Sequence, residues 1–303
     1  MTQRFCVAGA GISGLVAAYR IRAAAGPDAE IVLFDPADRP GGVLRTETLG
    51  GQPFDIGAEA FIVRRPEVPA LLAELGLANR QISPTGVRTT IFSQGRLHPL
   101  PPGTVNGIPG SAASLAGLVD TATREHVAAE PARLMHWLHG SDPSVGALVA
   151  DRFGAQVVAR SVDPMLSGVY AGSAAGIGLR SAVPAVASAL DAGAPNLTAA
   201  VRSVLPGGNP GPVFGAIDGG YQILIDAVIA AAGARLIYAP VTAIASDGDR
   251  WSVTDGSGRS WVADGLVVAT PAPQAAALLA GAARRAAELA ARVQVAPAAV
   301  LAP

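Results

Sequence analysis

Three glycines near the start of the chain have the spacing of a nucleotide-binding turn. Gly9, Gly11 and Gly14 follow a short apolar run, Arg4 to Ala8, in the pattern GxGxxG. In such a turn the first glycine permits a sharp bend, the second admits a pyrophosphate, and the third lets the next helix pack against the strand. The N-terminus of that helix favours an anion. We therefore predict a dinucleotide site formed by Gly9, Ala10, Gly11, Ile12, Ser13 and Gly14.

An acidic residue follows the second predicted strand. This apolar run, Glu30 to Phe34, ends at Asp35. An acid about 20 residues past the glycine turn holds a ribose hydroxyl in dinucleotide-binding folds. A plain glycine-rich loop is the alternative interpretation of GxGxxG. Its position between a strand and a helix, with an acid closing the second strand, favours the nucleotide site. We assign Asp35 and Pro36 to the adenosine ribose.

The segment after Asp35 bears on which dinucleotide is bound. Residues 39–46, RPGGVLRT, resemble the RxGGxxx(S/T) element that lies against FAD in glutathione-reductase-like flavoproteins. Gly42 permits close backbone approach there, and Arg45 can serve the phosphates or the turn. A simple β-turn beside an arginine is the alternative. The resemblance implies FAD rather than NAD.

The chain offers few side chains for lysine, cysteine or metal chemistry. All 22 basic residues are Arg, which excludes a lysine Schiff base within this chain. Cys6 is the sole cysteine, so neither an internal disulfide nor a CxxC pair can form. His136 and His139 have the spacing of one helix face but lack nearby acids or cysteines, so we predict no metal site. The net charge of −1 favours neither nucleic acid nor anionic lipid.

The elements that would position these residues alternate as in an α/β fold. The strand over 4–8 precedes a helix over about 13–25 and the strand over 30–34. A late apolar run, Gly265 to Thr270, is expected to be a buried strand that rejoins this sheet. We predict a Rossmann-like, glutathione-reductase-type FAD-binding domain formed by residues 1–56 and 215–303. A helical and β substrate lobe over 57–214 is inserted into it.

Nothing in the chain predicts a membrane span. The longest apolar stretch, Ile223 to Ala234, carries Asp226 and is shorter than the roughly 20 residues that a span needs. The spacing of the N-terminal glycines argues against a secretory signal. We expect a cytoplasmic protein, and peripheral contact with a membrane is compatible with these observations.

Several sequence blocks together resemble the oxygen-dependent protoporphyrinogen and coproporphyrinogen oxidases of haem synthesis, inside the flavin amine oxidase superfamily. Three opening blocks are shared by the whole superfamily, and two later ones are more specific to the porphyrinogen oxidases. The shared blocks are GAGISGL (9–15), RPGG (39–42) and FDIGAEAF (54–61). The specific ones are LPPGTVNGIPGS (100–111) and DPMLSGVYAG (163–172), and GGYQILIDAV (219–228) and ADGLVVATPAPQAA (263–276) extend the match.

This resemblance implies an activity and further site residues. A hydride would pass from the porphyrinogen macrocycle to flavin N5, and O2 would reoxidise the flavin to give H2O2. The Ala-, Arg- and Pro-rich composition is typical of actinobacteria, where coproporphyrinogen III is the implied substrate and protoporphyrinogen IX the alternative. The resemblance also implies that the porphyrin product is passed on to other enzymes of the haem pathway. The flavin side would be formed by Gly57, Ala58, Glu59 and Ala60, and Val241 would touch the adenine through its backbone. We assign the substrate wall to Arg64, Arg65, Gly168, Tyr170 and the loop 100–109.

Other interpretations remain open. A flavin amine oxidase or a carotenoid-type desaturase shares the opening motifs, although amine oxidases commonly use a lysine near flavin N5. The porphyrinogen oxidases close their FAD site with a C-terminal glycine-rich segment that is not found before Pro303. We therefore expect a truncated chain, and a non-catalytic flavin-binding remnant is a further alternative.

Overall fold

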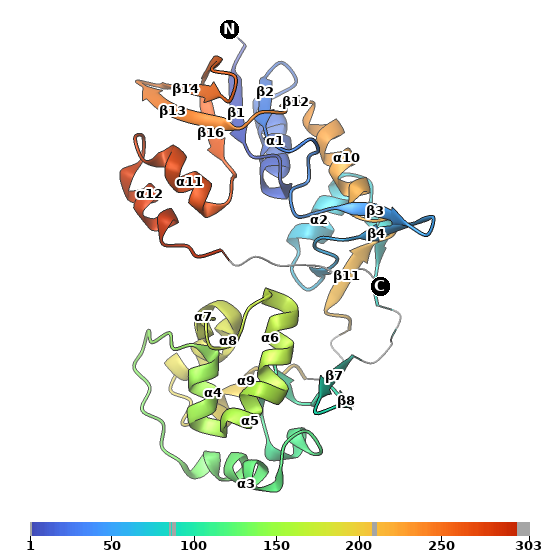
Figure 1. Ribbon diagram of the computed structural model, residues 1–303, viewed down its shortest axis with the longest axis vertical. Helices are drawn as coiled ribbons and strands as arrows, with labels where there is room; N and C mark the ends of the chain where they lie inside the picture. Colours follow the sequence, from blue (N-terminus) through green and yellow to red (C-terminus); the bar gives the residue numbers. More distant parts are fainter. Residues whose placement is uncertain (1, 85, 87–88, 208–210, 296–303) are drawn as a thin grey trace. The chain divides into compact units, whose positions relative to one another are not determined.

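The computed structural model describes residues 2–84, 86, 89–207 and 211–295, which form two compact units (Figure 1). Unit 1 combines residues up to 84 with those from 212 onward, and unit 2 comprises 85–211. The first boundary falls later than the residue 57 expected from the sequence. The reason is that β5 (Phe61–Ile62) and β6 (Gln81–Ile82) both pair with β11 (Phe214–Ile217), which keeps 57–84 in unit 1.

A four-stranded parallel sheet organises unit 1. β1 (Arg4–Ala8) pairs with β2 (Glu30–Phe34) on one side and with β16 (Gly265–Val268) on the other. β12 (Arg235–Ile237) extends the sheet beyond β2, giving the order β12-β2-β1-β16. The late strand therefore rejoins the sheet as predicted, with Phe5 opposite Gly265. It is half-buried rather than fully buried, because it lies at the edge of the sheet.

One face of this sheet is covered by two helices. Val7, Ile31 and Leu33 belong to the cluster formed with α1 (Ile12–Ala25) and α10 (Gln222–Ala232). Ile31 and Leu33 are two apart on β2 and so share a face, and Val7 lies opposite Leu33 in the register of the two strands. The two helices run beside each other over the sheet (Figure 1). This arrangement places the start of α1 at the carboxyl end of β1, where the glycine turn lies.

The opposite face packs on a small antiparallel sheet. Cys6, Val32 and Phe34 join its buried side chains, and the Phe34 ring meets the Trp261 ring edge-on with centroids 5.5 Å apart. Burial raises the pKa of the Cys6 thiol to about 11, so the thiol stays protonated. The small sheet contains β13 (Val241–Asp247), β14 (Arg250–Asp255) and β15 (Ser260–Ala263), in that order.

The other elements of unit 1 are short. A short helix, α2 (Glu67–Glu74), follows the hairpin of β3 (Thr46–Leu49) and β4 (Gln52–Asp55) along the chain. The others are η1 (Ala78–Arg80), α11 (Ala272–Leu279) and α12 (Arg284–Ala291).

Unit 2 is mainly helical. One hairpin pairs β7 (Thr90–Ser93) with β8 (Arg96–Pro99), and a second pairs β9 (Thr104–Val105) with β10 (Ile108–Pro109). The helical elements are η2 (Ala112–Leu115), α3 (Thr121–Ala129), η3 (Glu130–Ala132), α4 (Val145–Phe153), α5 (Ala155–Val157), a π-turn (Val158–Val162), α6 (Asp163–Tyr170), α7 (Leu179–Ala182), α8 (Pro184–Asp191) and α9 (Leu197–Val204).

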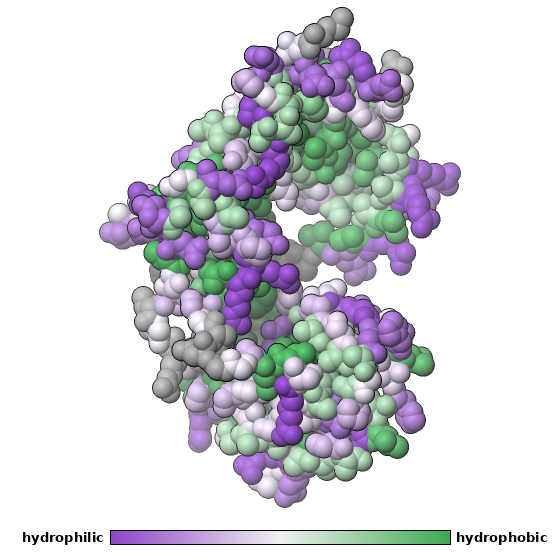
Figure 2. Space-filling view, turned by 180° about the vertical axis from the view of Figure 1, so that it is seen from behind, coloured by the Kyte–Doolittle hydropathy of each residue, from purple (hydrophilic) through white to green (hydrophobic). Residues whose placement is uncertain are grey.

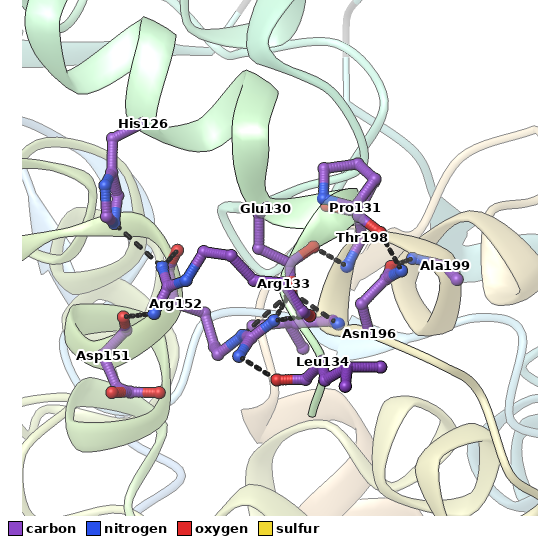
Figure 3. Close-up of polar contacts among 11 residues, drawn as sticks. His126, Glu130, Pro131, Arg133, Leu134, Asp151, Arg152, Asn196, Thr198 and Ala199 are labelled. Atoms are coloured by element: carbon purple, nitrogen blue, oxygen red, sulfur yellow. Dashed lines mark hydrogen bonds and ion pairs between the residues drawn. The ribbon is translucent and has the colours of Figure 1, made fainter. Parts of the chain in front are cut away.

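A buried ion pair holds the helices of unit 2 together (Figure 3). Glu130 is fully buried, and its carboxylate accepts from Arg152 Nε at 2.9 Å and from the amides of Leu197 and Thr198 at the start of α9. Arg152 also donates to the carbonyls of Arg133 and Leu134. Arg152 on α4 is thus joined to the segment that follows η3.

The segment that carries the two histidines is a loop. Residues 133–144 contain no helix, so the idea that His136 and His139 share a helix face is wrong. Helices are also short elsewhere, and none within the described part of the chain could cross a bilayer. On the face drawn in Figure 2, hydrophobic residues form separate patches among hydrophilic ones.

Candidate functional site

The turn between β1 and α1 requires glycine at two positions. Gly9 has φ +102°, and a Cβ there would lie 2.7 Å from the Ala269 carbonyl oxygen. A Cβ on Gly14 would lie only 1.8 Å from the Gly9 carbonyl oxygen. The first glycine therefore makes the bend and the third allows the helix to approach, as the spacing predicts. Gly11 is the N-cap of α1 and provides no side-chain cap, so the first N–H groups of the helix remain available.

A second glycine loop lies directly against this turn. The Gly41 amide donates to the Ala10 carbonyl at 2.8 Å, and a Cβ on Gly42 would lie 3.0 Å from the Gly11 Cα. Arg39 shapes the loop, because its guanidinium donates to the carbonyls of Gly42 and Leu44, each at 3.0 Å. The sequence predicted the close approach at Gly42 but missed the part played by Arg39.

Asp35 links the end of β2 to the glycine turn. Its Oδ2 accepts from the Ala10 amide at 2.7 Å, and its Oδ1 accepts from the Ala37 amide at 2.9 Å. The Asp35 amide donates to the Ile237 carbonyl on β12. The carboxylate is half-buried and still has lone pairs for another donor, while Pro36 is exposed beside it.

The segment from residue 57 to 60 runs beside the second glycine loop. The Ile56 amide donates to the Arg45 carbonyl at 2.8 Å, and the Ala58 amide donates to the Val43 carbonyl at 3.0 Å. Gly57 permits this pairing, because a Cβ there would lie 1.9 Å from the Val43 carbonyl oxygen. The three residues after Gly57 are exposed: Ala58, Glu59 and Ala60.

Arg45 and Thr46 have protein partners of their own. Arg45 Nε pairs with Glu47 Oε1 at 2.7 Å, and half of the arginine side chain is exposed. Thr46 Oγ1 donates to Asp55 Oδ1, and both atoms receive amide hydrogen bonds from the start of α10. Burial, followed by the charges of Asp55 and Glu59, raises the pKa of Tyr221 to about 12, so its phenol is neutral.

The residues present fit a dinucleotide. Two glycine loops meet backbone to backbone at Gly11 and Gly42, where side chains would fill the approach, and α1 offers uncapped N–H groups. A buried hydroxyl, Thr270 Oγ1, has no hydrogen-bond partner, and the Thr270 amide nitrogen lies 3.2 Å from a Cβ built on Gly9. A polar ligand at the turn would supply such a partner.

Val241 begins β13 and packs partly buried against the cluster that contains Phe34, the residue before Asp35. The strand is irregular between Val241 and Ala243, where its register with β14 shifts. Val241 therefore packs on the same cluster as Phe34, the last residue of β2.

The residues predicted to contact substrate divide between the two units. Arg64 and Arg65 are exposed and follow β5 in unit 1, whereas Gly168 and Tyr170 are exposed on α6 in unit 2. Within unit 2, two predicted blocks converge on one carbonyl. Asn106 Nδ2 donates to the Ala182 carbonyl at 3.0 Å, and the Tyr170 hydroxyl lies 3.4 Å from the same oxygen.

The loop 100–109 also packs against the π-turn before α6. Ser161 Oγ donates to the Gly107 carbonyl at 2.6 Å, and Gly107 has φ +81°. A Cβ at Gly107 would lie 2.3 Å from the Ser161 carbonyl oxygen. The block 100–111 thus contacts the turn that leads directly into the block 163–172, although more than fifty residues separate Gly107 from Ser161.

Comparison with known proteins bears on the function of the two joined glycine loops. The model of the family "Flavin containing amine oxidoreductase" matches residues 12–302. This chain belongs to that family. It is 60% identical over 286 residues to a Mycobacterium tuberculosis protein named coproporphyrinogen III oxidase, covering 94% of this chain and 63% of the relative. The Mycobacterium leprae protein of that name is 56% identical over 303 residues, which are all of this chain and 67% of the relative.

A solved structure has the same fold. It is that of a proposed protoporphyrinogen oxidase from Exiguobacterium sp. 255-15, with a TM-score of 0.79 and 26% identity. The match covers 95% of this chain and 64% of that one. The chain therefore spans about two thirds of the length of the relatives that it matches.

Proposed function

We propose that this chain binds FAD and serves in the oxidation of coproporphyrinogen III to coproporphyrin III. The observation that supports the substrate most strongly is the 60% identity to a mycobacterial coproporphyrinogen III oxidase. Family membership supports a flavin, and the two joined glycine loops beside an uncapped helix favour the dinucleotide form, FAD.

The proposed role of each residue in binding FAD follows from its place in the fold. The amides at the start of α1, at Ile12 and Ser13, would hold the pyrophosphate. Asp35 would accept from the adenosine ribose, and the Val241 backbone would face the adenine. The segment 57–60 and the loop at Gly42 and Arg45 would lie on the flavin side.

The proposed oxidation requires little acid–base catalysis by protein side chains. When bound, a flavin would supply a hydride acceptor that O2 can reoxidise with formation of H2O2. The chain's own residues would bind the macrocycle, orient it and exclude water. Arg64 and Arg65 would pair with substrate propionates through charge-assisted hydrogen bonds. Gly168, Tyr170 and the loop 100–109 would form the wall of the substrate site.

The cellular setting follows from the same assignment. A reducing, cytoplasmic compartment suits a chain whose single cysteine is buried. Peripheral contact with a membrane, and release of the porphyrin to a later enzyme of haem synthesis, are part of the proposal.

Fluorescence of newly formed porphyrin tests the proposal. With FAD and O2, coproporphyrinogen III should be converted faster than protoporphyrinogen IX, and H2O2 should form in proportion to the porphyrin. Replacing both arginines, Arg64→Ala with Arg65→Ala, should raise KM about tenfold, the size expected for a lost charged contact. Arg285→Ala on α12 is the matched control. Amine-dependent H2O2 without porphyrin formation would instead favour an amine oxidase. If the protein contains FAD but catalyses neither reaction, the chain is a non-catalytic flavin-binding remnant.

A further inference from the structure

We infer that Thr46 and Asp55 are positioning residues for the cofactor, because they fasten the segment 57–60 to the start of α10. The inference rests on the proposed placement of that segment on the flavin side. These two residues lie opposite each other on the hairpin β3–β4, which leads directly into Ile56 and Gly57. We call the pair, with the two amides that it binds, the Thr46–Asp55 clamp.

The clamp consists of three hydrogen bonds. Thr46 Oγ1 donates to Asp55 Oδ1 at 2.5 Å. The Gln222 amide donates to Thr46 Oγ1 at 3.0 Å, and the Tyr221 amide donates to Asp55 Oδ1 at 3.1 Å. Tyr221 is the N-cap of α10 but provides no side-chain cap. The hairpin therefore supplies the acceptors that this helix end needs.

The backbone before α10 is built to admit the clamp. Gly220 has φ +88°, and a Cβ there would lie 2.4 Å from Thr46 Cγ2 and 3.1 Å from Asp55 Oδ1. Any other residue at position 220 would push the hairpin away from the helix. The glycine at position 220 is thus explained by this contact.

The same helix also touches the other glycine loop. Ile225 Cδ1 on α10 lies 2.5 Å from a Cβ built on Gly41, so the loop around Gly42 rests on α10. The segment after Asp55 is bonded to that loop through the amides of Ile56 and Ala58. α10 therefore supports both backbone segments assigned to the flavin side, and the clamp fixes one of them relative to the other.

Isosteric substitution tests the role in cofactor binding. Thr46→Val removes the hydroxyl and keeps the shape, Thr46→Ser restores the hydroxyl, and Thr48→Val is a control on an exposed residue of the same strand. FAD is titrated into the flavin-free full chain, and the dissociation constant and the reduction potential of the bound flavin are measured. We expect Thr46→Val to weaken FAD binding about tenfold and to shift the potential, as the loss of a partly buried hydrogen bond to a carboxylate implies. Thr46→Ser and Thr48→Val should match the wild type.

The outcomes separate the clamp from the cofactor assignment. Wild-type affinity and potential in Thr46→Val, or equal changes in Thr46→Val and Thr48→Val, would overturn the clamp alone. A wild-type chain that binds no FAD would overturn the proposed function and the clamp's role with it. Circular dichroism of the flavin-free proteins checks folding. If Thr46→Val does not fold, Asp55→Asn keeps the acceptor oxygen without its charge and should weaken FAD binding about threefold; wild-type affinity there would again overturn the clamp.

Discussion

Asp35 Oδ2 accepts a hydrogen bond of 2.7 Å from the Ala10 amide, which joins the end of β2 to the glycine turn after β1. Two elements of the nucleotide fold are thus held by one carboxylate, which is also the group assigned to the ribose. The position of the turn and the recognition of the cofactor should therefore be lost together when Asp35 is replaced.

We predict that Asp35→Ala weakens FAD binding by at least tenfold, because it removes both the ribose acceptor and the partner of the Ala10 amide. FAD titration of the flavin-free protein measures the effect. Asp38→Ala is the matched control, since Asp38 is exposed in the same loop. If both variants bind FAD equally well, Asp35 has no part in the site.

Removal of Glu130 should destabilise unit 2. Glu130→Ala leaves Arg152 buried without its carboxylate and leaves the Leu197 and Thr198 amides without acceptors. We expect a loss of about 3–5 kcal/mol in the free energy of unfolding, typical of a broken buried pair. Denaturant unfolding checks this. Glu288→Ala breaks a pair on the exposed surface of α12 and should have little effect; similar losses in both variants would contradict the account of the buried pair.

Acid should weaken unit 1 through Asp255. The Ser257 hydroxyl, then the Trp261 indole, hold the pKa of this carboxyl at about 2. The folded pKa lies below the ordinary value near 3.9, so its stabilising effect is complete above that value and is lost as the pH falls from about 4 to 2. Thermal midpoints of wild type and Asp255→Asn should differ most above about pH 5 and converge in acid. A difference that does not change with pH would rule out this origin.

Local rules predicted the elements near the glycine turn. Only glycine suits the positive φ at Gly9 and the close approach at Gly14, so their spacing in the sequence identifies the turn. The edge strand β16 was predicted because a continuous apolar run is typical of a parallel strand. Its partial burial depends on strand order, which no local pattern specifies.

The contacts that were missed join residues far apart in the chain. Asp55 and the Tyr221 amide are 166 positions apart, and Thr46 and the Gln222 amide are 176 apart. Neither Thr46 nor Asp55 has a neighbouring motif that indicates a cap for a distant helix. The late unit boundary was missed for a similar reason, because two-residue strands such as β5 and β6 are too short for an alternating pattern.

The central claim is that the two joined glycine loops hold FAD. The most direct measurement is the amount and mass of flavin released by denaturing purified wild type and Gly11→Trp. This variant can fold, because the nearest heavy atom to a Gly11 Cβ is the Gly42 Cα at 4.0 Å, but the indole would fill the approach to the turn. We predict about one FAD per wild-type chain and almost none in the variant, as one dinucleotide per such fold requires. NAD or no dinucleotide in the wild type, or full FAD content in Gly11→Trp, would contradict the claim.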